Sequence, residues 1–314
     1  MNYVFFDVEC ANCLNGEGKI CSFGYVKTDE NFKIIKKKDI LVDPAAPFLL
    51  GNAKTGNGIK LAYPLFRFQR ARTFPHYYKE IKALLEDENN LCLGFAVNQD
   101  VSYISYSCKR YGLPIIEFKF YDIQKMEKEL NHRANISGLD HLVEEYHLTS
   151  YTYHRSDDDA LMTMEVFKAL LDQNHFSLQD VLASFPDALD DTDHFLKLQV
   201  QRQKQKALKK AHNEKISQFF APCQTRFDIN FYNPKLYKKA FFMDYSILSK
   251  EMDYLLKHKE TMIAHGMILT RNPSLAHVVI VENIKKKPNI PSLPKRIIYM
   301  SLEELKIELS KKRN

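Results

Sequence analysis

The segment that most constrains the fold is residues 3–9, with the sequence YVFFDVE. Its apolar start predicts a buried β-strand. Alternate residues of a strand point to the same face, so Asp7 and Glu9 should emerge together while Val8 faces the other way. Two neighbouring carboxylates repel each other, and a divalent cation removes that repulsion because it prefers oxygen ligands. The pair indicates a metal site at the end of a sheet, although exposed strands also carry two acids in this spacing.

The periodicity of the following 170 or so residues predicts an α/β fold. Three strands precede the first helix, so the sheet should be mixed rather than wholly parallel. Residues 50–60, rich in Gly and Asn, are expected to be a mobile loop. The expected strands are 3–9, 20–27, 33–42, 91–97 and 115–122, and the expected helices are 75–87, 100–112, 136–148 and 157–173.

Two further sites along the chain carry candidate chemistry, and each also has a purely structural explanation. Asp100 follows a predicted strand and begins a predicted helix, where Asp is a common N-cap. His154 lies in a loop, where most histidines are simply solvated. Ser156 and Asp159 have the spacing of a capping box at the start of the next helix. Taken singly, none of these residues establishes a site.

Charge divides the chain into an acidic and a basic part. Residues 1–195 contain 21 Lys and Arg against 29 Asp and Glu, and residues 196–314 contain 24 against 10, so the net charges are −8 and +14. This asymmetry is typical of proteins with an anionic partner such as nucleic acid, although a Lys-rich solvated surface gives the same counts. Residues 197–216 predict an exposed connecting helix, which either contacts phosphates or is only solvated. Its cations are Lys197, Arg202, Lys204, Lys206, Lys209, Lys210 and Lys215.

The N-terminus and the cysteines bear on location. The chain starts without the basic region of a signal peptide and has no apolar run near the ~18 residues of a membrane span, so we expect a cytoplasmic protein with no membrane partner. The six cysteines fit the free thiols of a reducing compartment. Cys10 and Cys13 form a C-x-x-C pair, but no second pair completes a zinc site, so both are expected to be free.

In combination, these motifs resemble the DEDDh exonuclease superfamily, and within it the proofreading epsilon subunits of bacterial DNA polymerase III. The resemblance covers about residues 1–175 and includes FFDVE, the Asp100 region, LDHLVEEYHL and HRSDDDALMTMEVF. DALMT matches the family's D-A-x-x-T and selects Asp159 over Asp157 and Asp158. Two departures stand out: Cys10 replaces the usual Thr, and Gln99 precedes Asp100 as in oligoribonuclease, which leaves DNA or RNA open.

The resemblance implies a ribonuclease H-like mixed sheet with flanking helices and a 3′→5′ exonuclease activity. The implied substrate is a single-stranded 3′ end, with DNA favoured over RNA. Two Mg²⁺ or Mn²⁺ ions about 4 Å apart would activate water and neutralise the leaving oxygen. Asp7 would bridge both ions, Glu9 and Asp159 would hold one of them, and Asp100 would support the other. His154 would be the general base, since its ordinary pKa lies near neutrality.

Other roles are less specific. The resemblance places Cys10 and Ala11 near the terminal sugar, and Phe74, like Phe66 and Phe68, is either a stacking residue or part of the core. Tyr153 and Asp157 fit the tyrosine branch of the superfamily as an alternative. A 3′→5′ exoribonuclease and a non-catalytic nucleic-acid-binding scaffold are the alternative functions.

The predicted domains are an exonuclease domain over 1–178, a linker with the basic helix over 179–228 and a smaller α/β domain over 229–314. The last resembles a BRCT domain through AFFMDYS, a helix, Gly266 in a second strand, AHVVIVEN and RIIYMSLEEL. The usual Thr-Gly and Trp are missing, which argues against phosphopeptide binding and leaves another small α/β domain as the alternative. A protein partner is expected to bind there.

Overall fold

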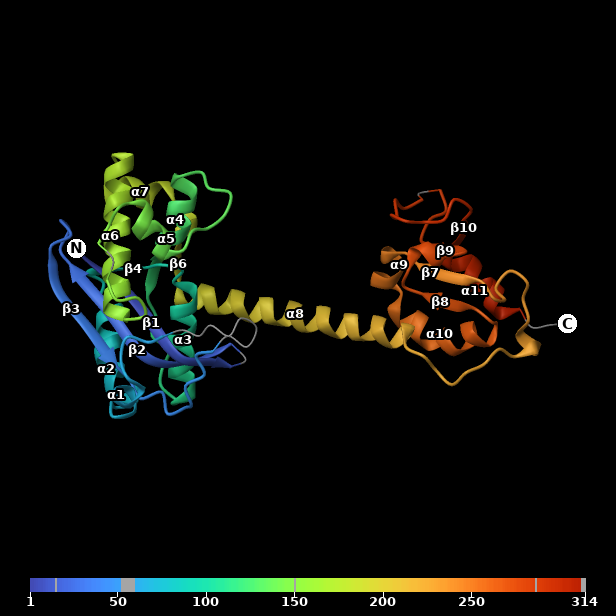
Figure 1. The fold of residues 1–314 in the computed structure, drawn as a ribbon, viewed down its shortest axis with the longest axis horizontal. Helices are drawn as coiled ribbons and strands as arrows, with labels where there is room; N and C mark the ends of the chain where they lie inside the picture. The colour runs from blue at the N-terminus through green and yellow to red at the C-terminus, as the bar shows by residue number, and fades with distance from the viewer. Residues whose placement is uncertain (15, 52–59, 150, 286, 312–314) are drawn as a thin grey trace. The chain divides into compact units, whose positions relative to one another are not determined.

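The computed structural model describes residues 1–14, 16–51, 60–149, 151–285 and 287–311. The chain divides into two compact units, Met1–Val200 and Gln201–Asn314 (Figure 1). Most of the loop expected over 50–60 falls on residues 52–59, outside the described residues. Within the described ranges, no helix is both long enough and apolar enough to cross a membrane.

The first unit is built on a six-stranded sheet of order β3-β2-β1-β4-β5-β6. β1 pairs antiparallel with β2 and parallel with β4, so the expected α/β fold with a mixed sheet is confirmed. Its strands are β1 (Asn2–Leu14), β2 (Glu17–Thr28), β3 (Ile34–Leu41), β4 (Asn90–Gly94), β5 (Lys119–Asp122) and β6 (Leu189–Asp191).

Helices cover both faces of this sheet, and the alternation along β1 separates two cores. Val4, Phe6 and Val8 pack in one core with residues of α2 and α3. Tyr3 and Phe5 pack in the other with residues of α4 and α6. The helices are α1 (Leu65–Gln69), α2 (Phe74–Leu85), α3 (Asn98–Arg110), α4 (Ile123–Leu130), α5 (Leu139–Glu145), α6 (Ser156–Asn174) and α7 (Leu178–Ser184), followed by the short η1 (Pro186–Ala188).

The first unit extends beyond the boundary at residue 178 that was expected from the sequence. β6 adds an antiparallel edge strand to β5. Phe195, in the first turn of α8 (Thr192–Phe220), lies in the core, and its ring centroid is 6.3 Å from that of Phe120. β6 was not predicted because its sequence is polar. A strand at the edge of a sheet can be polar, since the backbone groups on its outer side have no partner strand.

The second unit contains a four-stranded parallel sheet of order β10-β9-β7-β8. One expectation is corrected: Gly266 does not lie in a strand. Gly266 follows the end of α10 with a φ of +79°. Helices often end with a residue in this left-handed conformation, and that residue is usually glycine. The elements are η2 (Ile229–Phe231), β7 (Ala240–Met243), α9 (Tyr245–Lys250), α10 (Met252–Ala264), β8 (Ile268–Thr270), η3 (Pro273–Leu275), β9 (Val278–Val281), β10 (Ile298–Ser301) and α11 (Leu302–Ser310).

The basic stretch expected to be an exposed helix is part of α8, which has 29 residues. Its residues 201–211 are all exposed. Phe219, near its end, is buried in the core of the second unit. The helix prediction is therefore confirmed. Phe195 at the start of α8 belongs to a core of the first unit, and Phe219 near its end belongs to the core of the second.

Candidate active site

Asp7 and Glu9 lie on β1 in the series of alternate residues that begins with Tyr3 and Phe5, on the face covered by α6. Asp7 is paired in register with Gly24 of β2. A Cβ atom at Gly24 would lie 2.0 Å from the carbonyl carbon of Ser156 and 2.1 Å from the nitrogen of Asp157. The missing side chain therefore lets the first turn of α6 lie directly against the sheet, beside Asp7.

A hydrogen-bond network fixes this first turn. The hydroxyl oxygens of Ser156 and Ser22 are 2.5 Å apart, and the Ser156 hydroxyl donates to Oδ1 of Asp39 over 3.1 Å. Ser22 donates to the same Asp39 oxygen. Arg155, not Ser156, is the N-cap of α6, and no side chain caps it. The capping-box explanation for Ser156 and Asp159 is therefore wrong, because the serine hydroxyl bonds to the sheet instead.

The three consecutive aspartates of α6 differ in their partners. Lys37 of β3 pairs with Asp157, at 3.5 Å, and with Asp158. Arg155 Nε lies 2.8 Å from Oδ1 of Asp157. No Lys or Arg among the described residues forms an ion pair with Asp159. Two of the three charges are thus neutralised, and Asp159 is left facing the β1 carboxylates.

Asp100 is buried in the first turn of α3, but it is not a cap, because Val97 is the N-cap residue. Its pKa is raised by burial, and Glu9 raises it further. Burial also raises the pKa of Asp7, with Asp100, Asp159 and Glu9 adding to the effect. Burial, followed by the charge of Glu9, raises the pKa of Asp159 to about 7. These mutual effects place the four predicted carboxylates in one cluster.

This cluster fits a divalent cation. Oδ2 of Asp7 is buried without a hydrogen-bond partner, which is costly unless another group satisfies it. One ligand atom each from Glu9, His154 and Asp159 lie within 4.8 Å of one another. Carboxylate oxygens are the ligands that Mg²⁺ and Mn²⁺ prefer. A cation there would relieve the repulsion among these acids.

His154 lies in the loop before α6, with a φ of +59° and a side chain that is 44% exposed. Its Nδ1 is 3.1 Å from Oε1 of Glu9. This hydrogen bond raises the pKa of His154. With a proton on Nδ1, the basic nitrogen of the neutral ring is Nε2. Tyr153, unlike the exposed His154, packs against a hydrophobic cluster that includes Leu142.

The residues expected to contact substrate have different environments. Cys10 and Ala11 follow Glu9 at an irregularity in the β1–β2 pairing. Ala11 is fully buried, and its carbonyl accepts a hydrogen bond from the Leu49 backbone N–H. Phe74 is only 2% exposed and belongs to the core with Tyr78, so its predicted stacking on a nucleotide is corrected to core packing.

The sequence reasoning missed Asp39 and Gly24. Asp39 lies on the edge strand β3 among lysines, and only the tertiary contacts bring it to Ser156. Gly24 has no φ that requires glycine, so its role depends entirely on the close approach of α6. Phe68 is also buried, whereas Phe66 is 52% exposed.

Comparisons with known proteins identify the family of the first unit. The profile of the family described as exonuclease (RNase T) matches residues 4–167. No match was found among curated proteins.

Solved structures with a similar fold are distant in sequence. The nuclease domain of 3′hExo, a DEDDh family member bound to rAMP, is 14% identical, with a TM-score of 0.44 over 56% of this chain and 94% of that one. S. pombe Pop2p in its Mg²⁺- and Mn²⁺-bound form is 16% identical, with a TM-score of 0.44 over 57% and 84%. The zinc-bound E. coli ExoI–ssDNA complex is 11% identical, with a TM-score of 0.45 over 59% and 42%. Two further matched nucleases are covered over 65% and 64% of their length, so the chain spans less than two thirds of those proteins.

Proposed function

The chain belongs to the exonuclease family, and from this premise we propose that it is a metal-dependent 3′→5′ exonuclease that hydrolyses phosphodiester bonds at the 3′ end of single-stranded DNA. The membership predicted from the sequence is confirmed at the level of the exonuclease family, whose profile matches residues 4–167. The closer likeness to epsilon subunits, and with it a role in replication or repair, stays a prediction. So does the cytoplasmic location.

One observation carries the proposal: Asp7, Glu9, Asp100 and Asp159 cluster in the first unit, and His154 bonds to Glu9 at its edge. These are the five residues that the family resemblance names. The buried carboxylates among them, Asp7, Asp100 and Asp159, have raised pKa values, a state that a protein maintains at a cost to stability and that is common at functional sites.

The four carboxylates, Asp7, Glu9, Asp100 and Asp159, would hold two Mg²⁺ or Mn²⁺ ions. Bound there, the ions would supply Lewis acidity and charge neutralisation for hydrolysis. The pairing of Asp157 and Asp158 with Lys37 and Arg155 supports Asp159 as the ligand, since a neutralised carboxylate attracts a cation less.

His154 would accept the proton of the attacking water at Nε2. Its Nδ1–H donates to Glu9, which fixes the ring and keeps the other nitrogen directed away from the carboxylate. The loop position leaves the ring partly exposed, so it can reach a substrate that enters from solvent. Asp157, the partner that the tyrosine branch needs, is engaged by Arg155, which favours His154 over Tyr153 as the base.

RNA is the alternative substrate, because Gln99 precedes Asp100 as in oligoribonuclease. The side chain of Gln99 accepts a hydrogen bond from the Tyr103 hydroxyl over 3.2 Å, so it is held at the start of α3. This contact does not distinguish the two sugars, and the experiment below includes both.

We also propose that the second unit is BRCT-like and binds a protein partner. Support comes from its order of strand, helices, three strands and a final helix around a wholly parallel sheet. Asp244 caps α9 through a hydrogen bond from the Ser246 N–H, at the place where a BRCT domain usually has Thr-Gly.

The test is incubation of the full chain with 5′-labelled DNA and RNA oligonucleotides, with EDTA, Mg²⁺ or Mn²⁺. We expect a ladder of products shortened from the 3′ end only with metal. Asp7→Ala should abolish the ladder, while Asp140→Ala, which removes an exposed carboxylate of the same unit, should not. A ladder unaffected by EDTA and by Asp7→Ala would contradict the metal assignment, and no ladder with either substrate would support a non-catalytic scaffold.

A further inference from the structure

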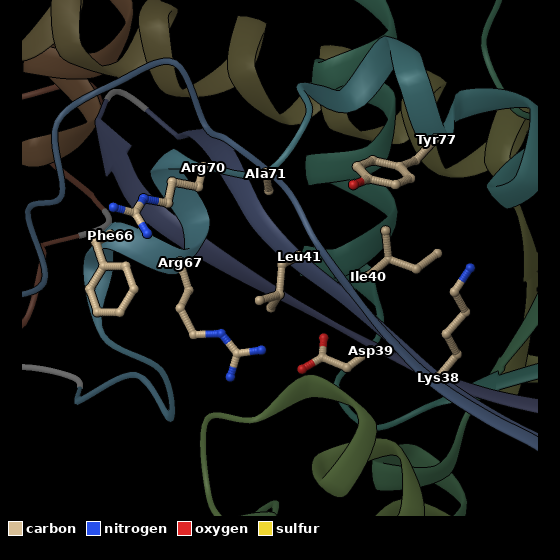
Figure 2. Close-up of a pocket in the computed structure, with 9 residues that line it drawn as sticks. All are labelled: Lys38, Asp39, Ile40, Leu41, Phe66, Arg67, Arg70, Ala71 and Tyr77. Carbon is tan, nitrogen blue, oxygen red and sulfur yellow. The ribbon is translucent and has the colours of Figure 1, made fainter.

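A groove of about 490 Å³ lies in the first unit between β3, α1 and α2. Figure 2 shows that Lys38 and Asp39 extend from β3, that Phe66, Arg67 and Arg70 extend from α1, and that Tyr77 comes from α2. The residues assigned to the chemistry do not line it. The groove is therefore a separate feature whose lining combines cations with aromatic rings.

The cations of the groove differ in whether they are paired. Lys38 forms an ion pair with Glu80. No carboxylate among the described residues pairs with Arg67 or Arg70. The Arg67 guanidinium lies over the Tyr63 ring, 4.6 Å from its centroid, and that of Arg70 lies 5.3 Å from the centroid of Phe66. Stacking holds a guanidinium by its face and leaves its N–H edge free to bind a planar or phosphate anion.

Phe66 is an exposed aromatic residue beside these cations, and 52% of its surface is accessible. It is on the same short helix as Phe68, which is buried. The helix therefore buries Phe68 in the core and exposes Phe66 to solvent, next to Arg67 and with the Arg70 guanidinium over its ring. Alternating cations and an exposed ring are the features by which proteins hold a single strand, since phosphates meet the cations and an unpaired base stacks on the ring.

The groove has two contacts with residues at the start of α6. Asp39, in its lining, accepts the hydrogen bond from Ser156 at the start of α6. The Tyr63 ring that supports Arg67 also lies 5.7 Å from the guanidinium of Arg155, the residue after His154. These two contacts join the groove to the start of α6, the helix that carries Asp159.

We propose that this groove binds the single-stranded nucleic acid upstream of the scissile bond, with Arg67 and Arg70 on successive phosphates and Phe66 stacked on a base. The inference rests on the proposed exonuclease function, and it adds a site that the chemistry does not require. Its contacts are with phosphates and a base ring, so the groove should hold DNA and RNA alike. A duplex is excluded from it because paired bases offer no free face to Phe66.

The test compares Arg67→Ala/Arg70→Ala with Arg72→Ala/Lys79→Ala, a control that removes the same charge from exposed residues outside the groove. Phe66→Ala is compared with Leu65→Ala, its exposed neighbour. Three measurements are made on the full chain: hydrolysis of a dinucleotide and of a 15-mer with Mn²⁺, binding of the 15-mer in EDTA over a salt series, and binding of the duplex 15-mer and of polyglutamate in EDTA.

For Arg67→Ala/Arg70→Ala we expect a KM for the 15-mer that is roughly 10- to 100-fold higher than that of the wild type. The increase in KM for the dinucleotide should be at least tenfold smaller than that for the 15-mer. The salt slope of log K should fall by about 1.4, at ~0.7 for each phosphate contact on a single strand. Phe66→Ala should weaken binding without changing the slope. Both controls should stay within about twofold of the wild type.

Four outcomes would overturn the inference. The first is equal loss in the arginine variant and its control. The second is equal loss on the dinucleotide and the 15-mer, which would place the arginines at the scissile bond itself. The third is retention of 15-mer binding by the arginine variant together with loss of binding to polyglutamate, which would reassign the groove to acidic peptides. The fourth is a preference of the groove for duplex. A wild type that cleaves neither substrate contradicts the proposed function alone, since the binding series still decides the groove.

Discussion

Asp159→Asn should stabilise the metal-free protein, although it removes a residue assigned to the active site. Burial and the charge of Glu9 raise the pKa of Asp159 from its ordinary 3.8 to about 7. Each tenfold change in an ionisation constant corresponds to ~1.36 kcal/mol, so the ionised form is disfavoured in the folded state by about 4 kcal/mol. A raised carboxylate pKa contributes stability that is complete below the unfolded value, near pH 4, and is lost as the pH rises through about 7. The wild type should therefore lose up to about 4 kcal/mol from this group between pH 4 and pH 8.

The assay is thermal and urea unfolding in EDTA at several pH values. At pH 8, Asp159→Asn should be more stable than the wild type by as much as about 4 kcal/mol, or several degrees in Tm, with the difference shrinking toward pH 4. Asp158→Asn is the matched control: it removes the partner of Lys37, so it should destabilise the protein at pH 8. Added Mn²⁺ should stabilise the wild type far more than Asp159→Asn.

Two results would refute this reasoning. One is an Asp159→Asn variant no more stable than the wild type at pH 8 in EDTA, which would mean that the carboxylate is not held at a cost. The other is an equal response of both proteins to Mn²⁺, which would mean that Asp159 does not hold a cation.

Three other predictions concern the first unit, and a fourth concerns the second. Gly24→Ala should lower the free energy of unfolding by about 1–3 kcal/mol or more and abolish most of the activity, because its methyl group would overlap the backbone of α6. Gly51→Ala, which would meet no described atom within 4 Å, should be neutral in urea unfolding. Glu9→Gln should lower the pKa of His154 toward 6.5 in an NMR titration of the metal-free protein, since the hydrogen bond to Glu9 is the main cause of its rise; an unchanged pKa would contradict that. His154→Ala should slow nucleotide release by roughly 10²- to 10⁴-fold with metal binding retained, and Tyr153→Phe should not; the reverse order would favour the tyrosine branch. Deletion of residues 201–314 should leave cleavage of short oligonucleotides intact but lower the salt slope for a long single strand, because the deleted residues carry a net charge of +13. Identical slopes would mean that this basic part does not touch nucleic acid.

The sequence alone determined the features that depend on local periodicity. Alternation along β1 put Asp7 and Glu9 on one face, and that face is the one covered by α6. The motif DALMT marked the start of α6, where the Thr163 hydroxyl donates to the Asp159 carbonyl one turn earlier. Such relations involve residues a few positions apart, so the spacing in the chain already contains them.

Tertiary structure decided the features that depend on which distant segments meet. Phe66, Phe68 and Phe74 are alike in sequence, yet only Phe66 is exposed, because the packing of α1 and α2 against the sheet buries the other two. Asp157 and Asp158 are neutralised by Lys37, which lies about 120 residues earlier in the chain. The ion pairs of Lys37 and the close approach at Gly24 arise only once β2, β3 and α6 have come together, and the groove forms only where β3, α1 and α2 meet. No local pattern in the sequence records such contacts.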